Sequence, residues 1–423
     1  MRFGHRTFAS VRRHRNYRLY FAGQAISFTG TWVQQIAASW LVLELTHSPV
    51  AVGALALAQL LPITVLGLFI GSILDRYEVR RVALATETGQ LAISAALAIL
   101  TLSGWIHVWQ IYALAVLQGI AQSIGGPARH ALVFQMVGPE DLPNAIGLNS
   151  SLGTTARVVG PAIGGGIVAL AGTGVAFAIN SGSFFAELLA LVAVDATKLY
   201  VAPRNEATSV LSGALDALRY VVGSARAGIA FFGVLVLSTL SFNLNVLFPL
   251  LADRTLRSGA QTFGLIAAMF GLGALVGALA SARRGGNSLR YFLIGAFGYG
   301  VLELVLAPQT SLLVVCALLI LTGFFYIQWG ATALTAIQLE APEHLRGRAA
   351  SLYFWAFLGG APVGGVFAGW LVSIGGTRLA FFVAGTIAVL TSLVGWVRLA
   401  VSGGGSYASA LPFALRGRRR QLR

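Results

Sequence analysis

The chain consists mainly of long apolar runs, and these limit what it can fold into. The runs at 50–73 and 82–104 contain one charged side chain between them, Glu87. Each is longer than the roughly 20 residues that an α-helix needs to cross the hydrocarbon core of a bilayer. Hydrophobic residues make up 57% of the chain and charged residues only 10%, whereas soluble domains carry about 25% charged residues. We therefore expect a polytopic, all-α membrane protein.

The formal net charge of +15 would suggest a nucleic-acid partner if the protein were soluble. Here nearly all basic residues lie at alternate ends of the apolar runs, which is the positive-inside pattern of membrane proteins. The connections predicted to face outward contain only three basic residues, Arg254, Arg257 and Arg378. This distribution excludes nucleic acid as a partner and predicts that both termini are cytoplasmic.

The apolar runs predict twelve membrane helices. They lie near 17–43, 50–73, 82–104, 108–131, 145–171, 175–196, 226–252, 262–282, 289–307, 311–338, 348–374 and 378–401. A long connection at 197–225 separates an N-terminal half, 1–196, from a C-terminal half, 226–401, and a basic cytoplasmic tail follows at 402–423. Apolar residues recur in this connection at helical spacing, at 211, 215, 218 and 222. The connection is therefore either an amphipathic helix at the membrane surface or a simple tether.

The two halves contain the same motifs in the same order. Gly67-x-x-x-Gly71 followed by Asp75 is repeated as Gly273-x-x-x-Gly277 followed by Ser281. The sequence Gly-Pro-Ala-Ile-Gly-Gly at 160–165 recurs as Ala-Pro-Val-Gly-Gly at 361–365. The partners are separated by about half of the chain. We therefore predict two six-helix halves related by a pseudo-two-fold axis.

A short charged turn follows the run at 50–73, and it contains Gly71, Asp75, Arg76, Arg80 and Arg81. Gly71 and Asp75 share one helix face. The glycine lets a neighbouring helix approach closely, and Asp75 is placed to accept hydrogen bonds from the N-terminus of a facing helix.

This turn resembles the G-x-x-x-D-R-x-G-R-R loop of the major facilitator superfamily of secondary transporters, except that Glu78 and Val79 replace its usual Gly and a basic residue. The sequence at 160–165 is similar to the G-P-x-x-G-G signature of antiporters in that superfamily, and Arg157 precedes it by one helical turn. The stretches 126–132 and 139–145 resemble the branch that contains enterobactin exporters and macrolide efflux pumps. The resemblance covers almost the whole chain and implies proton antiport by rocking of the two halves around a central site.

The antiporter-like motif of the fifth predicted helix consists of Arg157, Gly160, Pro161, Gly164 and Gly165. The two glycines at 160 and 164 have the spacing that brings membrane helices into close contact. The proline is expected to bend the helix where neighbouring helices can accommodate it.

Ionisable side chains inside the bilayer are candidates for proton coupling, because inserting one costs about 2.5–3.5 kcal/mol. Arg157 and Glu187 lie at similar depths in the fifth and sixth predicted helices, about 18 Å from the helix ends. They form either a protonatable pair that drives transport or a fixed structural ion pair. Glu87 is a further candidate, with Arg129 or Arg157 as its partner. Glu303, near the outer end of its helix, is expected to be an interfacial carboxylate in contact with water.

Polar side chains recur on single faces of the first, fourth, seventh and tenth predicted helices, which line the pathway in the superfamily that the chain resembles. We therefore predict a substrate cavity lined by Gln24, Thr31, Gln35, Gln118, Gln122, Asn243, Asn245, Tyr326 and Trp329. Polar contacts between helices are the alternative for each stripe. A lining of amides, hydroxyls and aromatic rings suits sizeable amphipathic molecules rather than inorganic ions.

No sequence motif indicates enzymatic chemistry. Cys316 is the only cysteine, the histidines lack ligand spacing, and no phosphate-binding loop is found. We therefore predict an exporter in a bacterial inner membrane, with no metal and no cofactor beyond a proton gradient. The expected partners are the lipid bilayer and a small-molecule substrate, and the expected state is a monomer. The alternatives are a metabolite facilitator or importer, and a membrane receptor or scaffold that does not transport.

Overall fold

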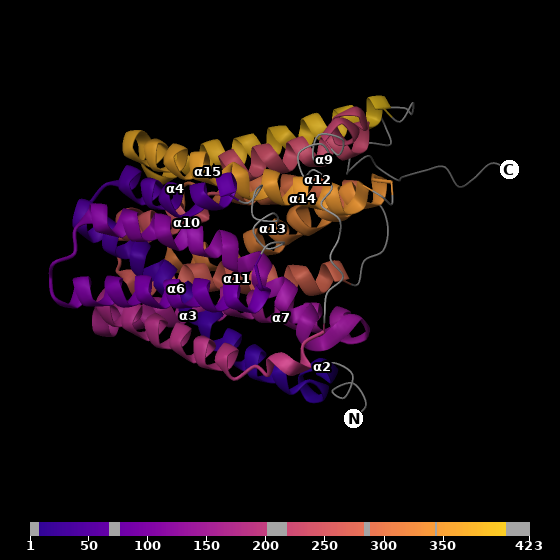
Figure 1. Cartoon of the computed structure of the whole chain (residues 1–423). Coiled ribbons are helices and arrows are strands. Elements are labelled where there is room, and N and C mark those ends of the chain that lie inside the picture. The colour runs from indigo at the N-terminus through magenta and orange to yellow at the C-terminus, as the bar shows by residue number, and fades with distance from the viewer. Residues whose placement is uncertain (1–7, 67–76, 201–217, 283–287, 343–344, 403–423) are drawn as a thin grey trace.

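A computed structural model describes residues 8–66, 77–200, 218–282, 288–342 and 345–402. Over these residues the chain forms helices and no strand, as Figure 1 shows. Eight of the described helical segments are long and apolar enough to cross a membrane. The expected all-α class is therefore confirmed.

The N-terminal part begins with the short helix α2 (Ala9–Arg13). The longer elements that follow are α3 (Arg15–Thr46), α4 (Pro49–Leu66), α6 (Val79–Leu102) and α7 (Val108–Val192), and a single turn, η1 (Ala196–Lys198), ends this part. Helix α7 covers three of the predicted spans and is interrupted at Gly138 and Gly172, where φ is 72° and 84°. Positive φ values favour glycine, which has no Cβ.

The C-terminal part contains shorter and less regular elements. They are α9 (Ala225–Val236), η2 (Leu237–Ser241), α10 (Leu244–Leu250), η3 (Leu251–Thr255), α11 (Ala260–Ala282), α12 (Ser288–Leu306), α13 (Leu312–Glu340), α14 (Arg346–Gly359) and α15 (Ala361–Ser402). Both η2 and η3 are π-helical turns. The span predicted at 226–252 as one helix is therefore divided by a π-turn and by the non-helical Phe242 and Asn243. Helix α15 is interrupted at Gly375 and Gly376.

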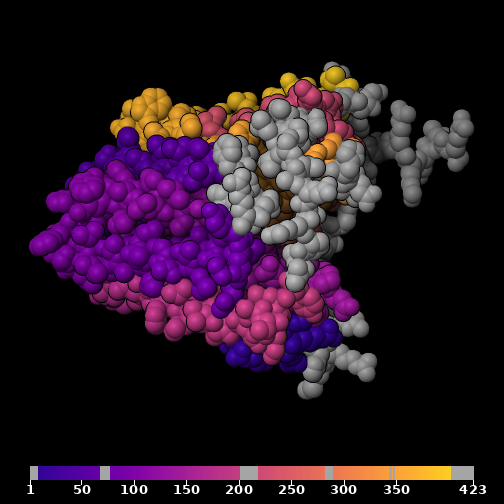
Figure 2. Space-filling view, in the orientation of Figure 1, coloured from indigo at the N-terminus to yellow at the C-terminus, as the bar shows by residue number. Residues whose placement is uncertain are grey.

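The two parts of the chain touch mainly along two helix pairs, α4 with α15 and α7 with α11. Figure 2 shows α4 and α15 in contact, with indigo atoms directly below orange ones. Glycines permit this approach: a Cβ added to Gly165 would lie 2.6 Å from the Cα of Gly264, and one added to Gly53 would collide with the carbonyl oxygen of Gly365. At the same end of the molecule, Arg254 Nη2 donates to the His47 carbonyl at 2.8 Å. The two parts are therefore closed against each other at that end.

The surface that the helices turn away from the core of the molecule is apolar. Leu170 and Leu313 are 91% and 81% exposed, and many other large apolar side chains are exposed along the helices. A soluble monomer rarely exposes so much contiguous apolar surface, so lipid is the solvent of this face.

Candidate functional site

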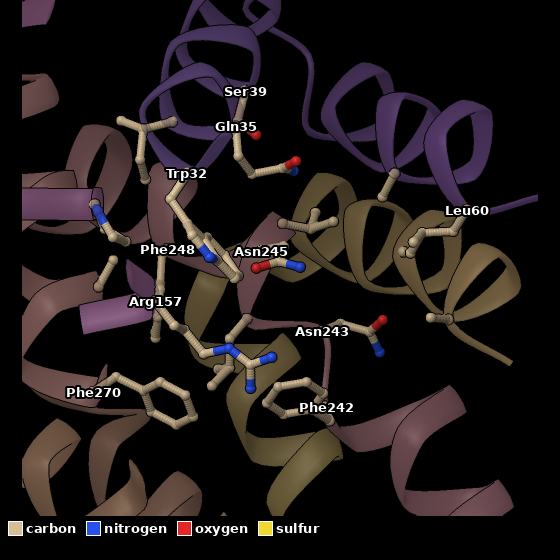
Figure 3. A pocket seen from close by; sticks show the side chains of 18 of the residues that line it. Trp32, Gln35, Ser39, Leu60, Arg157, Phe242, Asn243, Asn245, Phe248 and Phe270 are labelled. Carbon is tan, nitrogen blue, oxygen red and sulfur yellow. The ribbon is translucent and has the colours of Figure 1, made fainter. Parts of the chain in front are cut away.

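A central cavity of about 240 Å³ lies between the two parts of the chain (Figure 3). Helices α3, α4 and α7 contribute one wall of this central cavity. The other wall comes from α10, α11, α13, α14, α15 and the residues before α10. Its lining includes Trp32, Gln35, Ser39, Arg157, Pro161, Phe242, Asn243, Asn245, Phe248, Phe270, Tyr326 and Phe357. Four of the predicted cavity residues, Gln35, Asn243, Asn245 and Tyr326, are among them.

Arg157 brings a positive charge into this cavity. Its Nη1 donates to the Tyr326 hydroxyl at 3.4 Å, and its guanidinium carbon lies 5.5 Å from the centre of the Trp32 ring. Figure 3 shows the side chain extending between the rings of Phe242 and Phe270. Among the described residues, no carboxylate forms an ion pair with Arg157. An anionic group entering the cavity would therefore find a cation that is not neutralised by a carboxylate.

Aromatic rings form the opposite wall. Phe242 stacks on Tyr326 with ring centres 4.4 Å apart and an angle of 11° between the planes. Phe357 lies 6.3 Å from Phe242. Trp329 is completely buried behind this layer, so the prediction that it lines the cavity is wrong.

A second cavity of about 480 Å³ adjoins the first, and we call it the polar compartment. The two cavities share Trp32, Gln35, Ala56, Leu60, Arg157 and Asn245. The polar compartment adds amide, hydroxyl and charged side chains, namely Ser27, Thr31, Gln59, Gln90, Gln122, Arg129, Ser150, Thr154 and Glu187. Thr31 and Gln122, two of the predicted cavity residues, also line this compartment.

Of the predicted pairings of the buried carboxylates, the structure forms Glu87 with Arg129 and does not form Glu187 with Arg157. Arg129 forms an ion pair with Glu87, which is completely buried. Glu187 is 1% exposed, and its Oε1 has no hydrogen-bond partner among the described residues. The predicted Arg157–Glu187 pair is not formed, because the guanidinium of Arg157 is turned towards Trp32 and Tyr326.

The prediction that Glu303 is in contact with water is wrong, because its side chain is completely buried. The Tyr299 hydroxyl donates to Glu303 Oε1 at 2.8 Å, and Ser241 Oγ lies 2.9 Å from Oε2. Two neutral hydroxyls therefore surround this carboxyl group.

Two other predicted cavity residues, Gln24 and Gln118, form hydrogen bonds with neighbouring side chains. Gln118 accepts a hydrogen bond from Gln34 at 2.9 Å, and Gln34 also accepts from Ser94 and Asn180. Gln24 donates to the Tyr20 hydroxyl at 2.6 Å. Neither Gln24 nor Gln118 lines the central cavity or the polar compartment. The Gln118 contact joins α3 and α7, which fits the alternative interpretation of polar contacts between helices. Gln24 and Tyr20 both belong to α3, and they line a third cavity.

The comparison with known proteins agrees with this geometry. The profile of the family described as "Transmembrane secretion effector" matches residues 6–410. The chain belongs to this family of the major facilitator superfamily.

Curated relatives of this major facilitator protein cover most of its length. The enterobactin exporter EntS of Escherichia coli is 29% identical over 369 residues, which are 85% of this chain and 86% of EntS. The staphyloferrin A transporter of Staphylococcus aureus is 23% identical over 340 residues, 79% of this chain and 84% of that protein. The solved structure of the nucleoside transporter NupG has a TM-score of 0.72 at 12% identity, over 91% of this chain and 99% of NupG. At that identity the likeness to NupG concerns the fold alone.

The motifs that carry the superfamily resemblance lie partly within the described residues. Gly71, Asp75 and Arg76 of the charged turn fall outside them. Arg80 donates to the backbone carbonyls of Leu191 and Val192 at the end of α7. Arg81 pairs with Glu78 at 2.6 Å. Arg80 therefore contacts the C-terminal end of α7, and Arg81 contacts the residue before α6.

The antiporter-like motif packs α7 against two neighbours. A Cβ on Gly164 would lie 3.0 Å from the Cα of Val33, and Gly160 lies against Trp32. Gly165, on another face, meets Gly264 of α11. Pro161 lines the central cavity itself. The motif thus joins the cavity wall to the contact between the two parts of this major facilitator protein.

Several lining residues of this transporter were missed by the sequence analysis, chiefly Trp32, Gln59, Phe242 and Phe357. The search followed stripes of polar side chains, and an aromatic ring on an apolar helix gives no such signal. Trp32 could have been found, because it lies next to Thr31 and one helical turn from Phe28 and Gln35, beside the stripe on α3.

Proposed function

We propose that this protein is a secondary exporter in a bacterial inner membrane, with twelve membrane helices in two six-helix halves and cytoplasmic termini. It exports small amphipathic molecules by proton antiport and alternating access. The observation that carries this proposal is the central cavity between the two parts of the chain. Amides and stacked aromatic rings meet there with Arg157, which has no carboxylate partner among the described residues.

The contacts between the halves support an inward-facing state. The closed end contains the glycine contacts of α4 with α15 and the Arg254–His47 hydrogen bond. Arg80, Arg81 and Arg129 lie at the other end of the helices, which the positive-inside rule assigns to the cytoplasm. Alternating access then requires the glycine contacts at the outer end to separate while the inner ends of the halves approach.

Glu187 is the candidate for the proton-coupling site in the N-terminal half. It lines the polar compartment, and one of its oxygens has no hydrogen-bond partner among the described residues. An ionisable group in such a position can take up a proton from water in the compartment. Glu87 is the weaker candidate, because its side chain already forms an ion pair with Arg129.

The curated relatives suggest the class of substrate. EntS is named an exporter of enterobactin, and the Staphylococcus aureus relative a transporter of staphyloferrin A. We propose a solute of this kind, with an anionic group for Arg157 and an apolar or aromatic part for the ring wall. A cation held over an indole ring still has donor hydrogens free for an anion.

Transport in inside-out membrane vesicles tests the proposal, with enterobactin and staphyloferrin A as probes. An exporter that exchanges protons accumulates the probe in vesicles whose interior is acidified, and a protonophore abolishes the accumulation. The Glu187→Gln variant should lose gradient-driven accumulation and keep downhill exchange. Uptake that occurs only in right-side-out vesicles would identify an importer. Transport of neither probe in either orientation would contradict the proposed substrate class.

A further inference from the structure

Glu303 is a buried acid that the N-terminal proton site leaves unexplained. It lies in the last turn of α12 and is 0% exposed. The elements packed against α12 carry few ionisable side chains: Arg226 on α9, Cys316, Tyr326 and Glu340 on α13, and Arg378 and Arg398 on α15. Among the described residues, none of these forms a hydrogen bond or ion pair with Glu303. Its partners are hydroxyls, from Tyr299 of α12 itself and Ser241 of η2.

The number of hydrogens that the Ser241 hydroxyl can donate indicates which protonation state of Glu303 fits this geometry. Ser241 Oγ lies 2.9 Å from Glu303 Oε2 and 3.0 Å from the carbonyl oxygen of Ala384 in α15. A serine hydroxyl has one hydrogen to donate and two lone pairs that can accept. If Glu303 is ionised, only one of these two contacts can be a hydrogen bond. If Glu303 carries a proton, both can be: the carboxyl donates to Ser241 Oγ, and the serine hydroxyl donates to Ala384.

The same serine connects Glu303 to the central cavity. Ser241 is the last residue of the π-turn η2, which closes with the Phe242 amide donating to the Leu237 carbonyl at 2.7 Å. Phe242 is the next residue, and its ring stacks on Tyr326, which accepts a hydrogen bond from Arg157. Single π-turns in helices are frequent at functional sites. A change at Ser241 therefore has a short physical route to the ring wall.

We propose that Glu303 is a second proton-binding site of the transport cycle and that its proton controls the π-turn η2 and the placement of Phe242 in the cavity. This proposal rests on the proposed function, proton-coupled transport. When the proton leaves for water, the serine hydrogen turns from Ala384 to the carboxylate, and the link between η2 and α15 is lost. Tyr299 donates to Oε1 in both states. Phe242 and Tyr326 then follow the altered turn, and the wall against which a substrate rests changes shape.

Infrared difference spectroscopy on protein in lipid nanodiscs tests the site with the proton itself as the ligand. Acidic and alkaline samples are compared in a Glu187→Gln background, which removes the carboxyl group of the main candidate in the N-terminal half from the spectrum. We expect a protonated-carboxyl carbonyl band that disappears at alkaline pH. The Glu303→Gln substitution should abolish this band. Glu44→Gln, at an exposed glutamate at the end of α3, is the matched control and should preserve it. A band that survives Glu303→Gln, or no titrating band at all, would overturn the site.

Hydrogen exchange of the backbone amides of 237–242 tests the connection to the cavity. After correction for the intrinsic pH dependence of exchange, the wild type should exchange differently in the two protonation states, and Glu303→Gln should lose this response. Ser241→Ala removes the connecting hydroxyl, so it should keep the titrating band and lose the exchange response. A pH response of this segment that persists in Glu303→Gln would overturn the connection.

Transport separates the failure of this proposal from the failure of the proposed function. In proteoliposomes, Glu303→Gln should keep the exchange of enterobactin across the membrane and lose its accumulation against a gradient. Full gradient-driven accumulation by Glu303→Gln, with wild-type accumulation intact, would overturn the coupling role of Glu303 alone. If the wild type itself does not respond to a proton gradient, proton antiport is wrong, and the spectroscopic band still decides whether Glu303 binds a proton.

Discussion

At the scale of single residues, Arg157 is the group whose substitution should change substrate binding most. A guanidinium in a cavity requires acceptors, and among the described residues Arg157 has only a hydroxyl oxygen and an indole ring. Hydrogen bonds to charged groups contribute about 1.5–3 kcal/mol, so Arg157→Gln should weaken enterobactin binding roughly 10- to 100-fold. Arg157→Lys should lose part of this, because an ammonium lacks the planar fork.

Titration calorimetry measures this loss, and Arg398→Gln supplies the control, since Arg398 is an exposed arginine of α15 away from the cavity. Wild-type affinity in Arg157→Gln would show that the substrate does not use this charge.

The ion pair of Glu87 with Arg129 should matter for folding rather than for coupling. Glu87→Gln leaves the Arg129 guanidinium largely buried without its anion, and breaking a buried pair on one side costs about 3–5 kcal/mol. We expect a markedly lower melting temperature in detergent. The double substitution Glu87→Gln with Arg129→Met should recover much of the loss, because it removes both charges. A Glu87→Gln protein as stable as the wild type would show that the pair contributes little.

The contacts of individual side chains are also what could be predicted least from the sequence. Depth along a helix can be counted, and both Arg157 and Glu187 lie well inside helical segments of α7. The direction in which a side chain leaves its helix depends on how the helices are rotated against each other, and the sequence does not contain that rotation. For this reason Arg157 faces Trp32 and Tyr326 instead of Glu187. Glu303 was assigned to water because it lies near a helix end, although neighbouring helices cover it completely.

At the scale of helices, the contact between α7 and α11 depends on one glycine face. A Cβ on Gly165 would lie 2.6 Å from the Cα of Gly264, and one on Gly166 would meet nothing within 4 Å. Gly165→Ala should therefore cost about 1–3 kcal/mol through overpacking and should shift the protein away from the closed outer end. Gly166→Ala is the matched control and should behave as the wild type. Thermal melting measures the loss of stability. The reaction of a membrane-impermeant thiol reagent with a cysteine introduced near His47 measures how accessible the outer end becomes.

The docking of α2 on α7 should depend on pH. Asp141 accepts hydrogen bonds from His14 at 2.9 Å and Arg13 at 3.2 Å. The His14 hydrogen bond, together with the charge of Arg13, lowers the pKa of Asp141 below its ordinary value. A lowered pKa in the folded state stabilises docking above the unfolded pKa, about 4, and the stabilisation disappears as the pH falls through the lower folded value. Hydrogen exchange in α2 should therefore increase only in that acidic range. In Asp141→Asn it should be raised at neutral pH as well, and equal protection in both proteins would contradict this role.

Helix existence could be predicted from the apolar runs, and the breaks of α7 at Gly138 and Gly172 lie in the connections predicted between spans. The break inside the span predicted at 226–252 could not be predicted. Gly138 and Gly172 lie in stretches with ordinary turn residues, and their positive φ values follow from the reversal of the chain at those points. The π-turn at 237–241 has an unremarkable sequence, Leu-Ser-Thr-Leu-Ser. It is held by contacts with distant residues, Glu303 and the Ala384 carbonyl, and such contacts have no local signal.

At the scale of the whole molecule, the sequence repeat and the contact pattern lead to the same expectation. The stretch 160–165 and its repeat at 361–365 each provide a glycine, Gly165 and Gly365, to a contact between the two parts of the chain. The repeated motif therefore lies at the surfaces that alternating access has to separate. That relation explains why the closed end of this structure is lined with glycines on both sides.

The last prediction follows from this closed end. With Cys316 replaced by serine, spin labels can be attached at Leu45 and Arg257 at the closed end, and at Tyr77 and Leu339 at the other, all of which are exposed. If the two halves rock about the central cavity, substrate and pH should lengthen the first distance and shorten the second in the same samples. Electron–electron double resonance measures both distributions with enterobactin at acidic and alkaline pH. Each of these pairs combines one label from each half. A pair within one half, such as Leu45 with Tyr77, should keep a constant distance and serves as the control. Two inter-half distances that change in the same direction, or a change within one half as large as that between the halves, would contradict rigid rocking.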